Sequence, residues 1–245
     1  ELFADFTRAN PGINVKFEAF AVENYATILS TALAGGKGAD VIHTRAYGGL
    51  EQFAKAGYLM PLEMNNVPEL ANLPADAQAS LTLRSDGKVY SLAFASQTLG
   101  LFVNKDVFAR AGLTPPTTWA ELISVSKALK DKGTPGGFAL GNATGDGLWC
   151  NWLVWSFGGQ LVDANNKVVI DSLQTLKALE YGKELYPNFV PGTLSWLDPN
   201  NNKAFLDGQV SVTNNGISIY VAAKNSPDAK LKEMAADIQH APYPI

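Results

Sequence analysis

Strand-like and helix-like segments alternate along the whole chain, and this alternation constrains the fold more than any other feature of the sequence. Segment 13–17 alternates apolar and polar residues, and 88–94 is a strand-like run that follows the Asp86-Gly87 turn. Segment 24–34 instead carries its apolar residues at helical spacing and ends at two glycines. The pattern restarts with a strand-like run at 99–103 and a helix at 105–111. Such alternation predicts α/β layers around a largely parallel sheet.

One helix start is marked with unusual clarity. Thr118 precedes Trp119 and is followed three residues later by Glu121, which is the pattern of a capping box. The threonine hydroxyl is expected to accept the amide of Glu121, while the glutamate carboxylate reaches back. The helical phase places Trp119 on a buried face, and we expect its ring in or against the core.

Two later helices are predicted from apolar spacing. The segment 148–157 holds three of the five tryptophans of the chain, and we expect Trp155 to lie in or against the core. The segment 172–185 has the clearest amphipathic spacing. Its inward face is predicted to hold Leu173, Leu176, Leu179 and Leu185.

Composition excludes several classes of function. The 245 residues carry a formal net charge of −4, and the 19 basic residues are scattered, which disfavours nucleic acid as a partner. No apolar run is long enough to cross a bilayer. One cysteine and two histidines argue against an internal disulfide and a structural zinc site, and we expect neither metal nor cofactor. Cys150 is predicted to be a buried, inert thiol.

No catalytic fingerprint is present. The glycine-rich segment 141–147 lacks the lysine and hydroxyl residue of a P-loop and does not have the spacing of a dinucleotide fingerprint. Gly216-Ile217-Ser218 lacks the second glycine of a nucleophile elbow. These absences favour a binding protein over an enzyme.

Aromatic and uncharged polar residues instead gather after the predicted strands. Ligands of open α/β sheets bind beyond the carboxyl ends of strands. Amides, hydroxyls and flat aromatic faces suit neutral polyhydroxylated ligands. The candidate ligand-binding residues are His43, Thr44, Arg45, Tyr47, Gln97, Asp146, Trp149, Trp152, Trp196, Asp198, Asn215 and Ser218.

The order and spacing of several short segments resemble one family, the sugar-binding extracellular solute-binding proteins of bacterial ABC transporters, which includes maltose-binding protein. The sharpest match is Asn104-Lys105-Asp106 followed by the run from Gly112 to Leu122. The other matching segments are 6–15, 29–42, 56–62, 87–92, 157–163 and 204–209.

The resemblance implies the two-lobed α/β fold of type II periplasmic binding proteins, with a ligand cleft between the lobes. By analogy the first lobe is 1–95, the second is 98–209, and 211–245 returns to the first. Chain crossings are implied near 95–97 and 212–214. Against the family pattern, the sequence is expected to be a fragment without the first strand and the C-terminal part.

The resemblance also implies roles for single residues. Gln97 matches a polar cleft residue that binds a sugar hydroxyl, and 43–47 matches the ligand loop of the first lobe. Segment 146–152 matches the cleft segment of the second lobe. Asn215 matches the Asn-Gly turn of the return crossing, where Ile217 and Ser218 replace the aromatic residue that is common in the family.

The implied function is capture of a sugar or polyol for an ABC importer. The partners would be the permease subunits, and the protein would be monomeric and periplasmic or extracellular, either free or anchored as a lipoprotein. An enzyme on a related two-lobed fold remains the alternative, with Asp146 and Asp198 as paired carboxylates of a glycoside hydrolase. Arg45 leaves an acidic sugar or a phosphate open as the ligand.

Overall fold

A computed structural model describes residues 2–44, 49–63, 66–83, 85–93, 98–141 and 148–244. The side chains at 22, 23, 69, 76, 80, 148 and 149 lie outside this description. The chain divides into two compact units, Glu1–Ser96 and Gln97–Ile245. Each unit is described by itself below.

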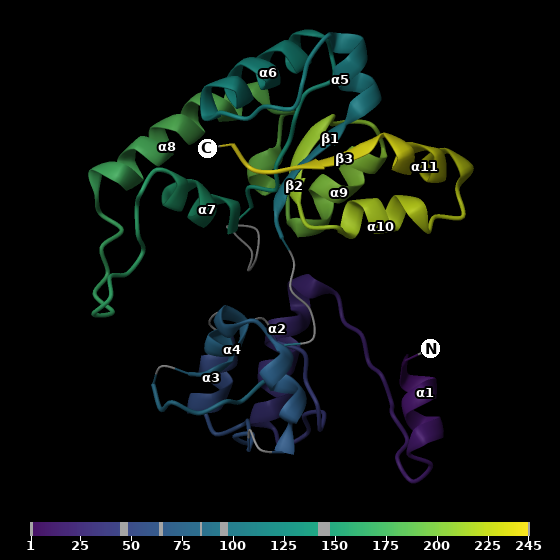
Figure 1. The fold of residues 1–245 in the computed structure, drawn as a ribbon, viewed down its shortest axis with the longest axis vertical. Helices are drawn as coiled ribbons and strands as arrows, with labels where there is room; N and C mark the ends of the chain where they lie inside the picture. Colours follow the sequence, from purple (N-terminus) through teal and green to yellow (C-terminus); the bar gives the residue numbers. More distant parts are fainter. Residues whose placement is uncertain are drawn as a thin grey trace. The chain divides into compact units, whose positions relative to one another are not determined.

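Unit 1 is built from short helices (Figure 1). Leu50 and Phe53 are buried on one helix, and a small apolar cluster contains Leu70, Leu81 and Val89. Its helices are α1 (Leu2–Ala9), α2 (Val22–Ala34), α3 (Gly49–Lys55), the 3-10 helix η2 (Pro68–Asn72) and α4 (Ala75–Leu81).

The strand-like segments of unit 1 do not form a ladder within the described residues. Residues 13–20 form neither helix nor strand, and 88–93 is joined to its neighbours by the Thr82–Val89 bridge and by a hydrogen bond from the Leu62 amide to the Val89 carbonyl at 2.8 Å. Alternating residues favour extended backbone, but a strand also needs a paired neighbour. The sequence-based expectation of strands is therefore met only in unit 2.

Unit 2 has a three-stranded sheet with the order β2-β1-β3 (Figure 1). The central strand β1 (Gly100–Asn104) pairs antiparallel with both β2 (Val212–Asn215) and β3 (Ile238–Ala241). Single parallel bridges join Gly136 to Val212 and Phe189. The chain keeps the predicted α/β class, but these ladders are antiparallel and not the largely parallel sheet that the sequence suggested.

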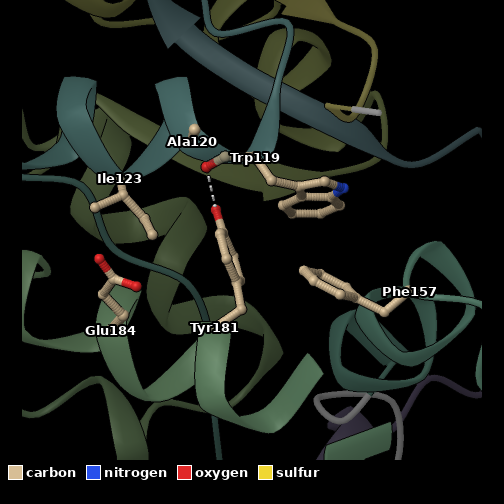
Figure 2. A pocket seen from close by; sticks show the side chains of 6 residues that line it. All are labelled: Trp119, Ala120, Ile123, Phe157, Tyr181 and Glu184. Atoms are coloured by element: carbon tan, nitrogen blue, oxygen red, sulfur yellow. Dashed lines mark hydrogen bonds between the residues drawn. The ribbon is translucent and has the colours of Figure 1, made fainter. Parts of the chain in front are cut away.

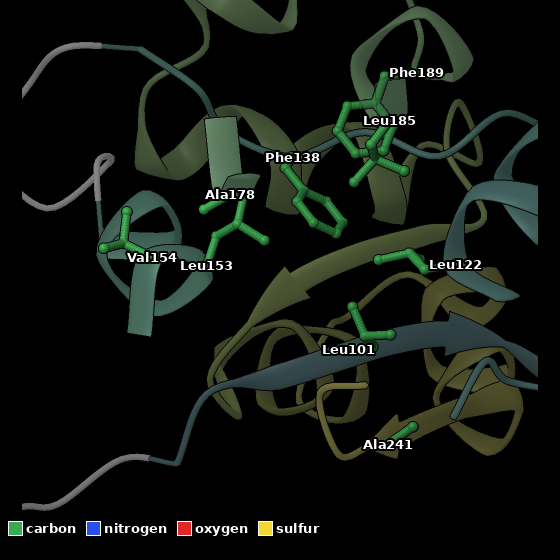
Figure 3. Packing of buried hydrophobic residues seen from close by; sticks show 9 residues of the cluster. All are labelled: Leu101, Leu122, Phe138, Leu153, Val154, Ala178, Leu185, Phe189 and Ala241. Atoms are coloured by element: carbon green, nitrogen blue, oxygen red, sulfur yellow. The ribbon is translucent and has the colours of Figure 1, made fainter. Parts of the chain in front are cut away.

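Successive side chains of β1 point to opposite faces of the sheet, so both faces are apolar and both are covered by helices. Leu101 packs with Leu122 and Phe138 on one face (Figure 3), whereas Phe102 packs with Phe205 and Ile219 on the other. The helices are α5 (Lys105–Ala111), α6 (Trp119–Asp131), α7 (Leu148–Ser156), α8 (Leu173–Leu185), η3 (Tyr186–Asn188), η4 (Thr193–Ser195), α9 (Asp198–Leu206), α10 (Ser218–Lys224), α11 (Ala229–Met234) and η5 (Ala235–Asp237).

The segment 211–245 differs from the sequence-based division of the chain. Its two strands flank β1 and share the core of unit 2, so the segment belongs to unit 2 and not with residues 1–95. The crossing expected near 212–214 lies inside β2, where ladder hydrogen bonds to β1 fix the backbone. Pairing between strands that are distant in sequence decides this assignment.

Helix α8 also differs from expectation. Leu173, Leu176 and Leu179 are 74%, 51% and 60% exposed, and only Leu185 of the four leucines is buried. The inward face instead carries Thr175 and Ala178, small side chains that allow the helix to approach the core closely.

Two residues of the predicted helix 148–157 are also more exposed than expected. Trp155 is 56% exposed, because its neighbours Leu153 and Val154 take the buried face of α7. Cys150 is exposed as a residue, and partial burial raises the pKa of its thiol. Trp119 packs against the core as predicted.

The capping box at the start of α6 is confirmed. The Glu121 carboxylate accepts the Thr117 amide at 2.7 Å and the Thr118 amide at 3.1 Å, and Thr118 Oγ1 accepts the Glu121 amide at 3.2 Å. These hydrogen bonds to its charged form, the Thr117 amide foremost, hold the pKa of Glu121 below its ordinary value of 4.5.

Thr118→Ala is therefore expected to lower the free energy of unfolding, measured by urea titration, by about 0.5–2 kcal/mol.

The folded-state pKa of Glu121 is depressed, so its carboxylate contributes stability above the unfolded pKa, and this stability is lost as pH falls through the folded pKa. Urea titrations should show a smaller loss of stability below about pH 4.5 in Glu121→Gln than in the wild type. Identical pH dependence in both proteins would contradict this assignment.

Candidate functional site

Uncharged polar side chains meet at the end of β2 in unit 2. Asn215 is the last residue of β2, Ser218 opens α10, and Asn202 lies on α9. Ser218 Oγ donates to Asn215 Oδ1 at 3.2 Å, and Asn202 Nδ2 donates to Ser218 Oγ at 3.2 Å. Asn215 Nδ2 in turn donates to Asn202 Oδ1, which closes a ring of three hydrogen bonds that we call the amide ring.

Asn201 holds the part of β2 that leads to the amide ring. This side chain is 2% exposed, and its Nδ2 donates to Thr213 Oγ1 at 3.2 Å and to the Asn214 carbonyl at 2.9 Å. The Gly216 amide donates to Asn215 Oδ1 at 2.7 Å. The end of β2 is thus held from the α9 side by both backbone and side-chain hydrogen bonds.

An aromatic pair in the same unit joins α7 to the segment that follows β3. The rings of Trp152 and Tyr243 stack with centroids 3.3 Å apart and planes inclined by 27°. Burial raises the pKa of Tyr243 to about 12, and the nearby Asn214 side chain partly opposes this shift. Tyr243 is therefore a neutral phenol at physiological pH, beside the strand that carries Asn215.

The other predicted site residues of unit 2 are not members of the amide ring. Trp196 packs against the Phe102 cluster, and its carbonyl accepts the Gly141 amide at 2.8 Å. Asp198 is exposed and begins α9, one helical turn before Asn202. Trp149 lies on α7, but its side chain is outside the described part.

In unit 1, His43 and Thr44 follow the segment 39–42, which forms neither helix nor strand. The Tyr25 hydroxyl of α2 donates to the His43 carbonyl at 2.5 Å, and burial raises the pKa of Tyr25. A Cβ added at Gly49 would lie 3.1 Å from Thr44 Oγ1, so the two flanks of 45–48 approach each other. The candidates Arg45, Tyr47, Gln97 and Asp146 lie outside the described residues.

The amide ring thus brings together two of the predicted residues, Asn215 and Ser218. Sequence reasoning missed Asn202, Tyr243 and Tyr25. The run of three asparagines at 200–202 was a usable signal, because amides are uncommon on the buried side of a helix unless they have partners. Tyr243 and Tyr25 carry no such signal, since their contacts come from distant segments.

A separate pocket of about 340 Å³ lies between α6 and α8 (Figure 2). The Tyr181 hydroxyl donates to the Trp119 carbonyl at 2.8 Å, and burial, with a smaller effect of the Glu184 charge, raises the pKa of Tyr181. None of the predicted site residues is among its lining residues, which are Trp119, Ala120, Ile123, Phe157, Tyr181 and Glu184.

Across the part of the chain that the structure describes, no three His, Cys, Asp or Glu side chains come close enough together to hold a metal ion. Over the same residues, no helix combines the length and the apolar character that a membrane span requires.

Two compact units, with a three-stranded sheet covered by helices in unit 2, match the class of two-lobed binding proteins. The chain belongs to the bacterial extracellular solute-binding protein family, whose sequence profile matches residues 1–245. It is similar to a putative binding protein of Brucella abortus, with 29% identity over 218 residues. That match covers 84% of this chain and 51% of the relative, so the chain spans about half the length of this relative.

Two further relatives carry more informative names. The multiple sugar-binding protein of Streptococcus mutans is 31% identical over 147 residues, which are 59% of this chain and 33% of that protein. The GacH receptor of Streptomyces glaucescens, whose structures include complexes with acarbose, superposes with a TM-score of 0.80 at 27% identity. The superposition covers 99% of this chain and 62% of the receptor.

Proposed function

We propose that the complete protein captures a small, neutral, polyhydroxylated molecule, a sugar or a polyol, and delivers it to an ABC importer. The observation that carries this proposal is the amide ring, because Asn202, Asn215 and Ser218 offer hydrogen-bonding groups without charge. Vicinal hydroxyls are both donors and acceptors and match such groups, whereas an ionic ligand would favour charged partners. Membership in the solute-binding family and the sugar-binding relative support the same ligand class.

Aromatic residues support this ligand class as well. The C–H face of a sugar ring is apolar and packs on flat aromatic side chains. Trp152 is half-buried in its stack with Tyr243, so part of the aromatic pair stays accessible. We assign Trp152 and Trp149 to the ligand site together with His43, Thr44, Arg45, Tyr47, Gln97, Asp146, Trp196 and Asp198.

We propose further that binding involves no chemical conversion of the ligand, and that the monomeric protein works outside the cytoplasmic membrane, free or lipid-anchored, with permease subunits as its partners. The extracellular solute-binding family supports this location. An exported protein that hands over its ligand needs reversible binding and no turnover.

Calorimetry of the complete protein against a panel of monosaccharides, oligosaccharides and linear polyols tests the ligand class. We expect saturable binding of at least one compound, recovered unchanged after prolonged incubation. Charged controls of similar size, such as a sugar phosphate and a polyamine, should bind more weakly. Tightest binding of a charged control would refute the neutral-ligand proposal, and release of a cleaved product would favour a glycoside-processing enzyme.

Gln97→Ala is expected to weaken binding of the best panel compound by about 5- to 150-fold, the equivalent of about 1–3 kcal/mol. A primary amide can satisfy two neighbouring hydroxyls, and its loss leaves a ligand hydroxyl without a partner away from water. Calorimetry on Gln97→Ala and on the exposed control Gln160→Ala measures the effect. Equal affinities in the wild type and Gln97→Ala would remove Gln97 from the site.

A further inference from the structure

Asn202 has no assigned role in the sequence pattern, yet it contacts both residues that the amide ring shares with the predicted site. Its Oδ1 accepts from Asn215 Nδ2, and its Nδ2 donates to Ser218 Oγ at 3.2 Å. The neighbouring Asn201 points inward and holds the backbone of β2. Consecutive residues of α9 therefore fix first the backbone and then the side chain at the end of β2.

The ring fixes the direction of every hydrogen bond in it. Asn202 donates to Ser218, Ser218 donates to Asn215, and Asn215 donates back to Asn202. Because each group is at once donor and acceptor, turning the Asn215 amide over would place two donors and two acceptors face to face. A closed ring of this kind strengthens each of its bonds and disfavours the flipped amide.

The amide ring uses most of the hydrogen-bonding capacity of Asn215. A side-chain amide has two N–H donors and an oxygen with two lone pairs. Both lone pairs of Asn215 Oδ1 are taken, one by the Gly216 amide at 2.7 Å and one by Ser218 at 3.2 Å. Asn215 then has one N–H left and can act toward a ligand only as a donor.

We propose that Asn202 is a positioning residue of the ligand site, which holds Asn215 as a hydrogen-bond donor and so selects an acceptor oxygen of the ligand at that point. This inference rests on the proposed function, because it concerns the same site. It goes further by assigning Asn215 as a hydrogen-bond donor to the ligand. A ligand hydroxyl or ether oxygen can accept this bond, and an ammonium group cannot. Asn202 itself acts through Asn215.

The affinity test uses a double-mutant cycle in the complete protein, with the panel compound that binds the wild type most tightly. Asn202→Ala is expected to weaken binding by roughly 5- to 50-fold, because Asn215 Nδ2 loses the acceptor that holds it on the α9 side. In the Asn215→Ala background the same change should cost less than about 2-fold, since its target is gone. Equal costs in both backgrounds would overturn the proposal.

Two further variants separate positioning from general stability. Asn202→Asp keeps an acceptor for Asn215 Nδ2, loses the donor to Ser218 and adds a negative charge, and it should retain affinity within about 5-fold of the wild type. Asn200→Ala is the matched control, because Asn200 lies on the same helix and its Oδ1 accepts the Leu197 amide at 2.7 Å without touching the ring. It should lower the melting temperature and leave affinity unchanged. An affinity loss in this control as large as that in Asn202→Ala would indicate a merely structural role.

A measurement without ligand keeps the two proposals distinguishable. The side-chain amide protons of Asn215 can be followed by nitrogen–proton correlation NMR, assigned by their loss in Asn215→Ala. We expect the proton that Asn215 Nδ2 donates to Asn202 Oδ1 to resonate downfield of its partner in the wild type and to move upfield in Asn202→Ala. Unchanged signals would overturn the positioning role. If these signals change as expected but no panel compound binds the wild type, the proposed function fails while the positioning role of Asn202 stands.

Discussion

Leu185→Ala is expected to lower the free energy of unfolding of the 245-residue chain by about 2–5 kcal/mol, whereas Leu179→Ala should change it by less than about 0.5 kcal/mol. Both leucines lie on α8, but Leu185 is 1% exposed and Leu179 is 60% exposed. Removing a buried side chain loses its transfer free energy and leaves a cavity beside Phe138 and Phe189, members of the same cluster.

Chemical denaturation with urea measures both variants under the same conditions. The pair is a matched control, since the substitution, the helix and the intrinsic helix propensity are the same. Helical spacing alone placed both residues inward, so the experiment separates the two descriptions of α8. Comparable losses at both positions would support the inward face predicted from helical spacing and contradict the exposed position of Leu179 in the structure.

Gly100→Ala is expected to lower the free energy of unfolding by about 1–3 kcal/mol. A Cβ at this position would lie 2.5 Å from the Ala241 carbonyl oxygen and 2.6 Å from His240 Nε2. The imidazole can turn away, but the carbonyl belongs to β3, which pairs with β1. The methyl group therefore forces the two strands apart.

The control is Gly12→Ala, because a Cβ there meets nothing within 4 Å and its backbone does not require a positive φ. We expect no loss at this position, and even a gain of up to about 1 kcal/mol from reduced freedom of the unfolded chain. Thermal melts of both variants provide the comparison. A Gly100→Ala protein as stable as the wild type would mean that β3 is not held against β1 as described.

Local signals in the sequence were enough for several elements of unit 2. The Thr118–Glu121 capping box, strand β1 and helix α5 with its stop at Gly112 all lie where the pattern predicts. The capping contacts span three or four residues, β1 is marked by its apolar run, and the glycine at φ 69° supplies a backbone that other residues avoid. Family membership was likewise readable from short segments in a fixed order, and the profile match confirms it.

The candidate site was only partly readable. Amides and hydroxyls after a strand pointed to Asn215 and Ser218, because both follow β2 closely in sequence. Asn202 and Tyr243 were missed, since they reach the site through the packing of α9 and through the segment after β3. No spacing rule connects side chains that are brought together by different elements.

The sequence by itself determined the α/β class, the capped helices, the uncharged polar character of the strand ends and the family. Only the tertiary structure decided that β2 and β3 flank β1 as antiparallel partners, that α8 exposes three leucines, and that Asn202 closes the amide ring. The physical reason is one of range. Capping and periodicity act between residues a few positions apart, whereas strand pairing, helix rotation and amide orientation depend on which distant surfaces fill the space around them.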